Sequence, residues 1–202
     1  MSQHNSGEPG EHQNSQAWTT LSYQQVLDTP HLQVRCEQVA LPYGGPIIPD
    51  YYIIENRGWV GIVPVTGDGR FLINRQYKHG IGFEVLEFPA GGIDPGEEDP
   101  LVTAHRELME ESGYSVAGND IELLAHMYAN PSGARTRIWW YLARNIQKTG
   151  EPKIDPAEVI ENLLVTPAEL LALIHSGEFA VPGQIAAAYM ALERLGYITM
   201  LC

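Results

Sequence analysis

The sequence has 202 residues, of which 44% are hydrophobic and 18% charged, and its 25 acidic and 12 basic side chains give a formal net charge of −13. This length and apolar content predict one folded domain with a real core, with or without an appendage, and argue against a wholly disordered chain. The negative charge disfavours a nucleic-acid-binding protein and one that docks on anionic membranes, because phosphate-rich surfaces require a basic footprint.

The first residues differ from the rest of the chain in composition. The stretch MSQHNSGEPGEHQNSQ is polar and has no apolar anchor, so residues 1–16 are predicted to be a disordered tail. It has no basic segment followed by an apolar run, so it does not resemble a secretory signal, and no stretch approaches the roughly 18 apolar residues of a membrane span. Cys36 and Cys202 form no disulfide framework or zinc motif, so a reducing, cytoplasmic location is expected.

Short β-rich runs follow the tail. Residues 31–41 and 50–55 are the first predicted strands, and they lie in an N-terminal β-rich segment, residues 17–56. Residues 59–65 and 71–77 are predicted to form a hairpin, because an Asp-Gly turn separates two apolar runs. A further strand over residues 83–88 ends at Pro-Ala-Gly-Gly.

Three helices are predicted from their end signals. The first covers residues 100–112, with Asp99 as N-cap, proline at the first position and Gly113 after the end. The second begins at a capping box at Thr166 and stops near Gly177, and the third covers residues 184–195. Strands are expected at residues 121–128, 137–143 and 159–165, so the order predicts a mixed α/β layer fold.

The first helix carries a cluster of carboxylates. Glu107, Glu110 and Glu111 are spaced i, i+3 and i+4, so they fall within an arc of about 100°. Leu101, Ala104 and Leu108 occupy a neighbouring arc that is expected to face the core. Clustered carboxylate oxygens suit a hard divalent cation such as Mg²⁺ and thereby phosphorus chemistry, although a solvated acidic helix face produces the same triplet.

The larger pattern around this helix resembles the Nudix box, G-x5-E-x7-R-E-U-x-E-E-x-G-U, where U is a bulky apolar residue. It runs without a gap from Gly92 through Glu98 and Arg106 to Tyr114. The resemblance implies an α/β Nudix-type α/β/α sandwich with a mixed β-sheet, which we assign to residues 57–202. It also implies Mg²⁺- or Mn²⁺-dependent hydrolysis of a nucleoside diphosphate linked to another group.

Carried over by position, the resemblance implies a set of site residues. The metal ligands are Glu98, Glu107, Glu110 and Glu111, joined by the backbone carbonyl of Ala90, and Arg106 orients the carboxylates. The loop between Pro-Ala-Gly and the helix is one residue longer than is usual in the family. Counted from Pro-Ala-Gly, the box glycine and its first glutamate are Gly91 and Glu97; counted from the helix, they are Gly92 and Glu98. The spacing counted from the helix is complete, so we favour Gly92 and Glu98. Glu158 is the first candidate for a further, catalytic general base, and Glu161 is the second.

The flanks of the box point to a substrate class. Glu87-Phe-Pro-Ala-Gly91, Arg75-Gln-Tyr-Lys78 and Pro131 resemble the ADP-ribose pyrophosphatase subgroup. This implies a nucleoside diphosphate sugar substrate, first ADP-ribose cleaved to AMP and ribose 5-phosphate. The alternatives are GDP-mannose or another nucleotide sugar, and a non-catalytic nucleotide-sugar sensor. The subgroup is typically dimeric through its N-terminal strands, so a homodimer is implied.

Local positive charge is needed to hold an anionic pyrophosphate on so acidic a chain. The candidate substrate-binding cations, all in or beside the motif strands, are Arg57, Arg75, Lys78 and Arg135. Tyr52 is a candidate for stacking on the base, although a tyrosine in a strand is also an ordinary core or interface residue.

Overall fold

The computed structural model describes residues 16–30, 32–154 and 159–199. The chain divides into two compact units between Asn56 and Arg57. Most of the predicted tail, the candidate base Glu158 and the C-terminal Cys202 lie outside the described residues. Within them, no helix has both the length and the apolar character needed to span a membrane.

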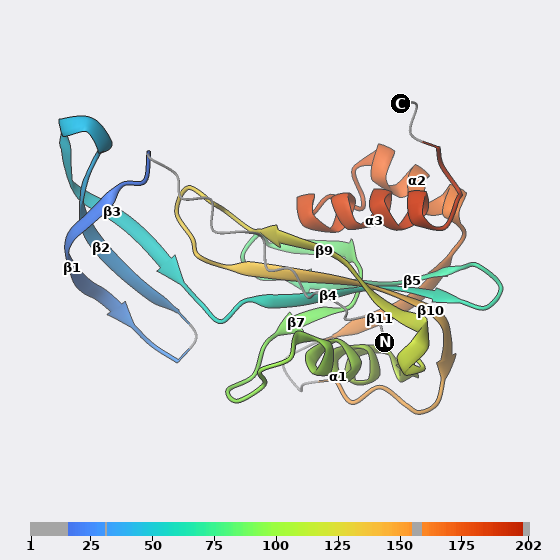
Figure 1. The fold of residues 1–202 in the computed structure, drawn as a ribbon. Coiled ribbons are helices and arrows are strands. Elements are labelled where there is room, and N and C mark those ends of the chain that lie inside the picture. Colours follow the sequence, from blue (N-terminus) through green and yellow to red (C-terminus); the bar gives the residue numbers. More distant parts are fainter. Residues whose placement is uncertain (1–15, 31, 155–158, 200–202) are drawn as a thin grey trace, which may run out of the picture. The chain divides into compact units, whose positions relative to one another are not determined.

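The first unit is an antiparallel sheet in the order β1–β2–β3, made of β1 (Thr19–Asp28), β2 (Gln33–Ala40) and β3 (Ile47–Glu55), with a short 3-10 helix, η1 (Pro42–Gly44), between the last two (Figure 1). All ten residues of β1 are exposed. The sequence pattern missed this strand because the alternation of Leu21 and Tyr23 is too short to mark a half-buried strand and the adjacent Val26 and Leu27 break it.

The second unit contains a mixed eight-stranded sheet with the central order β11–β5–β4–β10–β8. β6 lies beside β5, β7 beside β4 and β9 beside β10, and the β4–β10 pair is parallel while the others are antiparallel. The strands are β4 (Trp59–Thr66), β5 (Phe71–Lys78), β6 (Phe83–Glu87), β7 (Ala90–Gly92), β8 (Tyr114–Ser115), β9 (Ile121–Tyr128), β10 (Arg137–Lys148) and β11 (Ile160–Val165).

Helices cover both faces of this sheet (Figure 1). α1 (Pro100–Ser112) packs on one face, where its Ala104 and Leu108 are fully buried in a core with Val60 and Ile62 of β4. α2 (Pro167–Ser176) and α3 (Pro182–Arg194) close the other face over a second core that contains Trp140. The expected α/β/α sandwich is therefore confirmed, as is the prediction that α1 turns its apolar arc to the core.

The ends of α1 and α2 follow the predicted signals. The Asp99 side chain accepts a hydrogen bond from the backbone N–H of Leu101, and Gly113 ends α1 with φ of 73° in the left-handed region. Thr166 and Glu169 form the predicted capping box at the start of α2. These caps set where α1 and α2 begin and where α1 ends.

One short strand was predicted only as the end of the preceding run. Ala90–Gly92 form β7, whose residues pair with Gly61, Val60 and Trp59 of β4. Alanine and glycine carry no apolar alternation, so the pairing depends on β4 rather than on local preference. β7 places Ala90 and Gly91 against the side chains of Glu111 and Glu107 on α1.

Candidate active site

The carboxylates of α1 lie against the backbone of β7. Glu107 and Glu111 are only 9% and 6% exposed, and the N–H of Ala90 donates to Oε2 of Glu111 at 3.2 Å. A Cβ atom on Gly91 would lie 2.0 Å from Oε1 of Glu107. Glycine at this position therefore leaves the space that the Glu107 carboxylate occupies.

Arg106 organises the other carboxylates of the helix. Its Nη1 donates to Oε1 of Glu107 at 2.8 Å and to Oε2 of Glu110 at 3.0 Å, and its Nη2 donates to the carbonyl of Gly92 at 3.0 Å. Burial alone would lower the pKa of Arg106, but its hydrogen bonds and the charge of Glu107 outweigh burial and raise that pKa. The guanidinium therefore stays charged and holds like charges together.

The loop before α1 departs from the expected register. The spacing to the helix predicts Gly92 and Glu98 as the box glycine and first glutamate. In the structure, Gly91 and Glu97 are the residues that contact the carboxylates and Arg106. Glu97 accepts from Arg106 Nε at 3.2 Å and from Thr103 Oγ1 at 2.6 Å. Glu98 is exposed, with no hydrogen bond or ion pair to another described residue, and nothing lies within 4 Å of a Cβ on Gly92.

The reason for this difference is the extra residue of the loop. Counting from Gly91, the first glutamate is Glu97, so the added residue falls between Glu97 and the helix. The loop turns so that Glu97, rather than its neighbour, meets Arg106. Hydrogen bonds from Arg106 and then Thr103 lower the pKa of Glu97 to about 2. Glu97 is therefore an ionised partner of Arg106 at neutral pH.

Two asparagines hold Glu111, and motif reasoning missed both. Asn74 Nδ2 donates to Oε2 of Glu111 at 2.8 Å, and Asn162 Nδ2 donates to the backbone carbonyl of Glu111 at 2.9 Å. The two asparagines lie opposite each other on β5 and β11. The signal for such a position is an asparagine at the end of an apolar run in a strand, as Asn74 after Phe71–Ile73 and Asn162 before Leu163–Val165.

A second ion pair lies on the strands beside this site. Lys78 Nζ contacts Oε1 of Glu87 and Oε1 of Gln76, each at 2.5 Å. Glu87 is 9% exposed, and it pairs in register with Asn74 across β5 and β6. Lys78 and Asn74 are four residues apart on one strand, so their side chains leave the same face of the sheet. Lys78, a predicted phosphate contact, thus lies on the carboxylate side.

Arg75 and Glu161 lie on the opposite face of the sheet. They oppose each other in the β5–β11 register and form an ion pair at 2.9 Å, with side chains 43% and 57% exposed. Because strand side chains alternate, this face is not the one that Asn74 and Asn162 present to Glu111. The arrangement disfavours Glu161 as a base acting beside Glu111, and it separates Arg75 from the carboxylate cluster.

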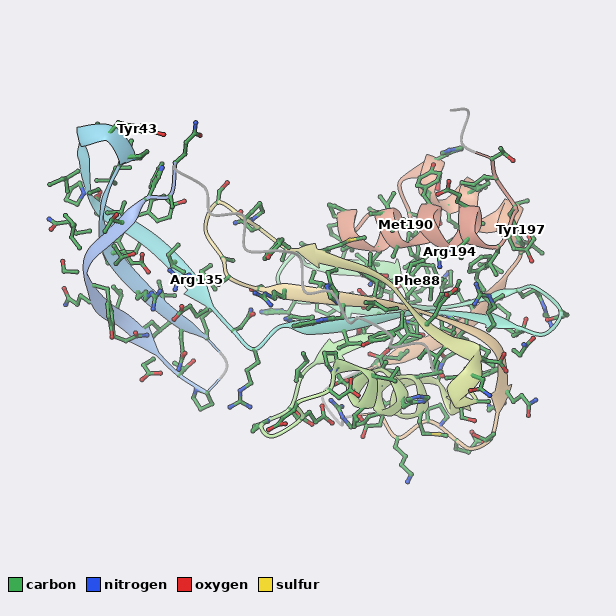
Figure 2. The ribbon with its side chains drawn as sticks, viewed as in Figure 1. Tyr43, Phe88, Arg135, Met190, Arg194 and Tyr197 are labelled. Atoms are coloured by element: carbon green, nitrogen blue, oxygen red, sulfur yellow. The ribbon has the colours of Figure 1, made fainter. Side chains whose placement is uncertain are left out.

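The remaining predicted substrate residues are dispersed. Arg135 lies in the loop between β9 and β10, labelled in Figure 2, where it lines a hollow of about 340 Å³ with Tyr128, Pro131, Ala134 and Arg137. Arg57 is exposed just before β4 and makes no ion pair with another described residue. Tyr52 belongs to the first unit, where it is 56% exposed and lies opposite Cys36.

The segment between β6 and β7 is fixed from the other face of the sheet. Gln184 of α3 accepts from the N–H of Phe88 at 2.8 Å and donates to its carbonyl at 3.4 Å, and it is 4% exposed. Figure 2 shows Phe88 on the side of the sheet that α3 covers. The next carbonyl, of Pro89, accepts from Ile62 N–H at 2.9 Å. These bonds set the path of the chain into Ala90, and the motif did not predict Gln184.

The donor set fits a hard divalent cation. Carboxylates of Glu107 and Glu111 lie beside the backbone of Gly91 and Ala90, and Arg106 joins Glu110 to Glu107; oxygen ligands of this kind are those that Mg²⁺ prefers. No three acidic, histidine or cysteine side chains in the described part of the chain already converge as ligands on one point. Arg106 bonds to Glu107 and Glu110 in this arrangement.

Comparison with known proteins agrees with this geometry. The model of the NUDIX domain matches residues 56–182, and that of the nucleoside diphosphate sugar hydrolase N-terminal domain matches residues 18–54. The chain is 29% identical to an ADP-ribose pyrophosphatase of Bacillus subtilis over 79% of this chain and 84% of the relative. An ADP-ribose pyrophosphatase of Mycobacterium tuberculosis is 32% identical over 59% of this chain and 56% of the relative.

A solved structure shares the fold. The crystal structure of an ADP compounds hydrolase superimposes with a TM-score of 0.76, covering 91% of this chain and 98% of the other at 24% identity. At that identity the likeness establishes the fold, while the family assignment rests on the match to the NUDIX domain.

Proposed function

This chain belongs to the Nudix hydrolase family, and from that premise we propose that it hydrolyses the pyrophosphate bond of a nucleoside diphosphate sugar, first of all ADP-ribose. Water attacks one phosphorus, the phosphoanhydride bond breaks, and the products are AMP and ribose 5-phosphate. The N-terminal match to nucleoside diphosphate sugar hydrolases and the two relatives named as ADP-ribose pyrophosphatases support this substrate class.

One observation carries the proposal: the carboxylates of Glu107 and Glu111 are buried directly against the backbone of β7, and Arg106 donates a hydrogen bond to Glu107. A helix whose acidic face served only solubility would expose these groups. Buried carboxylates need compensation, which Arg106 and hydrogen bonds begin to supply and a divalent cation would complete.

Nudix hydrolases generally require a divalent metal, and we propose Mg²⁺, with Mn²⁺ as an alternative. Glu107, Glu110 and Glu111, with the carbonyl of Ala90, would hold it. The ion would supply Lewis acidity toward phosphoryl oxygen and would lower the pKa of a bound water. Arg106 and Glu97 keep the carboxylates in position, and we propose Glu158 as the general base that accepts the proton of the attacking water.

The substrate residues remain proposals. Lys78 is the best supported of them, because it lies on the carboxylate face, where its ammonium group can neutralise a phosphate. Arg135 lines the hollow beside Tyr128, a surface that suits the nucleoside or sugar end of the substrate. We also propose Arg57, Arg75 and Tyr52 as substrate contacts, although the described contacts link none of them to the carboxylates.

We also propose a homodimer formed through the first unit. Its outer strand exposes the apolar side chains of Leu21, Tyr23, Val26 and Leu27, and exposed apolar surface of this kind favours association. Light scattering coupled to size exclusion tests this proposal through the mass of the particle. A cytoplasmic location remains a prediction from the sequence.

The deciding experiment is a panel of ADP-ribose, GDP-mannose and other nucleotide sugars, each incubated with the protein and Mg²⁺. The nucleoside monophosphate and the sugar phosphate that form are then separated and quantified. We expect ADP-ribose to be cleaved with the highest kcat/KM. Faster cleavage of GDP-mannose would favour the alternative substrate. Saturable binding without cleavage of any compound would favour a sensor.

The Glu111→Gln variant serves as the control for this panel. It removes the charge of a proposed ligand and retains the side-chain shape, so we expect at least about a 100-fold loss of kcat with an unchanged circular dichroism spectrum. A fully active Glu111→Gln protein would contradict the assigned site.

A further inference from the structure

We infer that Asn74 is a positioning residue for Glu111, which fixes the carboxylate through a neutral hydrogen bond and thereby sets the affinity of the site for its divalent cation. The inference rests on the proposed function in one respect, namely that Glu111 is a metal ligand. It goes further by assigning a task to a residue outside the Nudix box.

Two hydrogen bonds hold the carboxylate of Glu111. Its Oε2 accepts two hydrogen bonds, from Asn74 at 2.8 Å and from the N–H of Ala90 at 3.2 Å. Because both donors bind the same oxygen and come from different strands, they fix the plane of the carboxylate. Asn162 also bonds to Glu111 but reaches its backbone carbonyl, so that bond holds the helix and not the carboxylate.

Asn74 also conflicts with its surroundings. It is 1% exposed on β5, directly after the apolar run Phe71–Ile73, and asparagine is disfavoured in strands. Its own Oδ1 is buried without a hydrogen-bond partner among the described residues, as is Oδ1 of Asn162. Buried amide oxygens are normally satisfied, so an apolar residue would suit the core better. Residues that break such rules concentrate at functional sites.

The donors to the Glu111 carboxylate differ in charge from the donor to Glu107 and Glu110. Arg106 donates to Glu107 and Glu110 with a positively charged group, whereas Asn74 and Ala90 donate to Glu111 with neutral groups. A neutral donor orients a carboxylate and leaves its formal charge in place, while a cation partly cancels it and competes with a metal ion. Asn74 thus orients Glu111 and preserves its attraction for the cation.

The test is a titration of Mn²⁺ into the substrate-free full-length protein, with free Mn²⁺ measured by electron paramagnetic resonance. Asn74→Leu retains approximate size and removes the donor, so we expect its Mn²⁺ affinity to fall roughly 10- to 100-fold, the usual effect of losing a partner of a metal ligand. Asn162→Leu is the matched control, because it occupies the opposing strand position and lacks a bond to the carboxylate. We expect a smaller fall in its Mn²⁺ affinity than in Asn74→Leu, because its bond holds the helix backbone.

A double-mutant cycle shows whether Asn74 acts through Glu111. In a Glu111→Gln background, Asn74→Leu should cause no further loss of Mn²⁺ affinity. Where a nucleotide sugar is turned over, Asn74→Leu should lower kcat and leave KM nearly unchanged. Asn74→Ser, a smaller residue, provides a second variant if the leucine protein does not unfold cooperatively.

Equal loss of Mn²⁺ affinity in Asn74→Leu and Asn162→Leu would overturn the inference, because both changes would then act through general packing. Wild-type affinity in Asn74→Leu and Asn74→Ser would overturn it too. Failure of the proposed function looks different: no nucleotide sugar is hydrolysed, whereas the Mn²⁺ titration still reports on Asn74.

Discussion

Glu97 and Arg106 are joined by two hydrogen bonds, from Nε to Oε1 at 3.2 Å and from Nη2 to Oε2 at 3.3 Å. The pair links the loop before α1 to the centre of the carboxylate cluster, because Arg106 also donates to Glu107 and Glu110. The neighbouring Glu98, which satisfies the spacing of the box, is exposed and makes no such link within the described residues. The loop register therefore determines which acid supports the site.

The first prediction tests this register at the two acids. Glu97→Gln removes the charged partner of Arg106 and loosens the groups that Arg106 holds, so we expect roughly a 10-fold fall in kcat/KM. Glu98→Gln is the matched control, since it makes the same change one residue away on the exposed side of the loop. Steady-state assays of both variants decide the matter. A larger loss in Glu98→Gln would restore the assignment made from spacing.

The second prediction tests the two glycines. A Cβ on Gly91 would lie 2.0 Å from Glu107 Oε1, so Gly91→Ala must displace that carboxylate, and we expect at least about a 10-fold fall in activity with the fold retained. Gly92→Ala meets nothing within 4 Å and should retain activity within about twofold. Both assays use the same substrate and metal. Equal activities would mean that Glu107 need not hold this position.

The third prediction concerns stability in acid. The pKa of Glu97 is lowered from 4.5 to about 2 by Arg106 and Thr103, so its contribution to stability is present above pH 4.5 and is lost as the pH falls toward 2. Urea midpoints of the wild type and Glu97→Gln should therefore differ at pH 6 and converge across this window. A difference that stays constant down to pH 2 would show that ionisation of Glu97 contributes nothing.

The fourth prediction separates the two candidate bases. Glu161 pairs with exposed Arg75 at 2.9 Å on the face opposite the carboxylates, so Glu161→Gln should change kcat by less than about threefold and stability by less than about 1 kcal/mol. Glu158→Gln should lower kcat by about 100-fold or more if Glu158 is the base. Rate profiles against pH of both proteins provide the measurement. A severe loss confined to Glu161→Gln would reverse the assignment.

The fifth prediction concerns Gln184, which bonds to both backbone groups of Phe88. Gln184→Leu leaves a buried N–H and carbonyl unpaired, so we expect a loss of about 1–3 kcal/mol in the free energy of unfolding. Met190→Leu, at a partly exposed position of the same helix, should have little effect. Urea denaturation gives both values. An unchanged Gln184→Leu protein would mean that other contacts fix this segment.

Much of the site was available from the sequence, because its signals are local. The spacing of Glu107, Glu110 and Glu111 along one helix fixes their common face before any packing is known. Asp99 and Gly113 mark the ends of that helix through hydrogen bonds and backbone angles that depend on adjacent residues. The order of apolar runs likewise predicted the layered α/β fold, and the box predicted a Nudix hydrolase.

Tertiary structure alone decided which residues complete the site. Asn74, Asn162 and Gln184 are 37, 51 and 96 residues from their partners in the chain, so no local pattern connects them. A loop with one extra residue has more than one register, and contact with Arg106 and Thr103 brings Glu97, rather than Glu98, beside Arg106. Periodicity fixes the face of an element, whereas loop paths and cross-strand partners are set by the free energy of the whole fold.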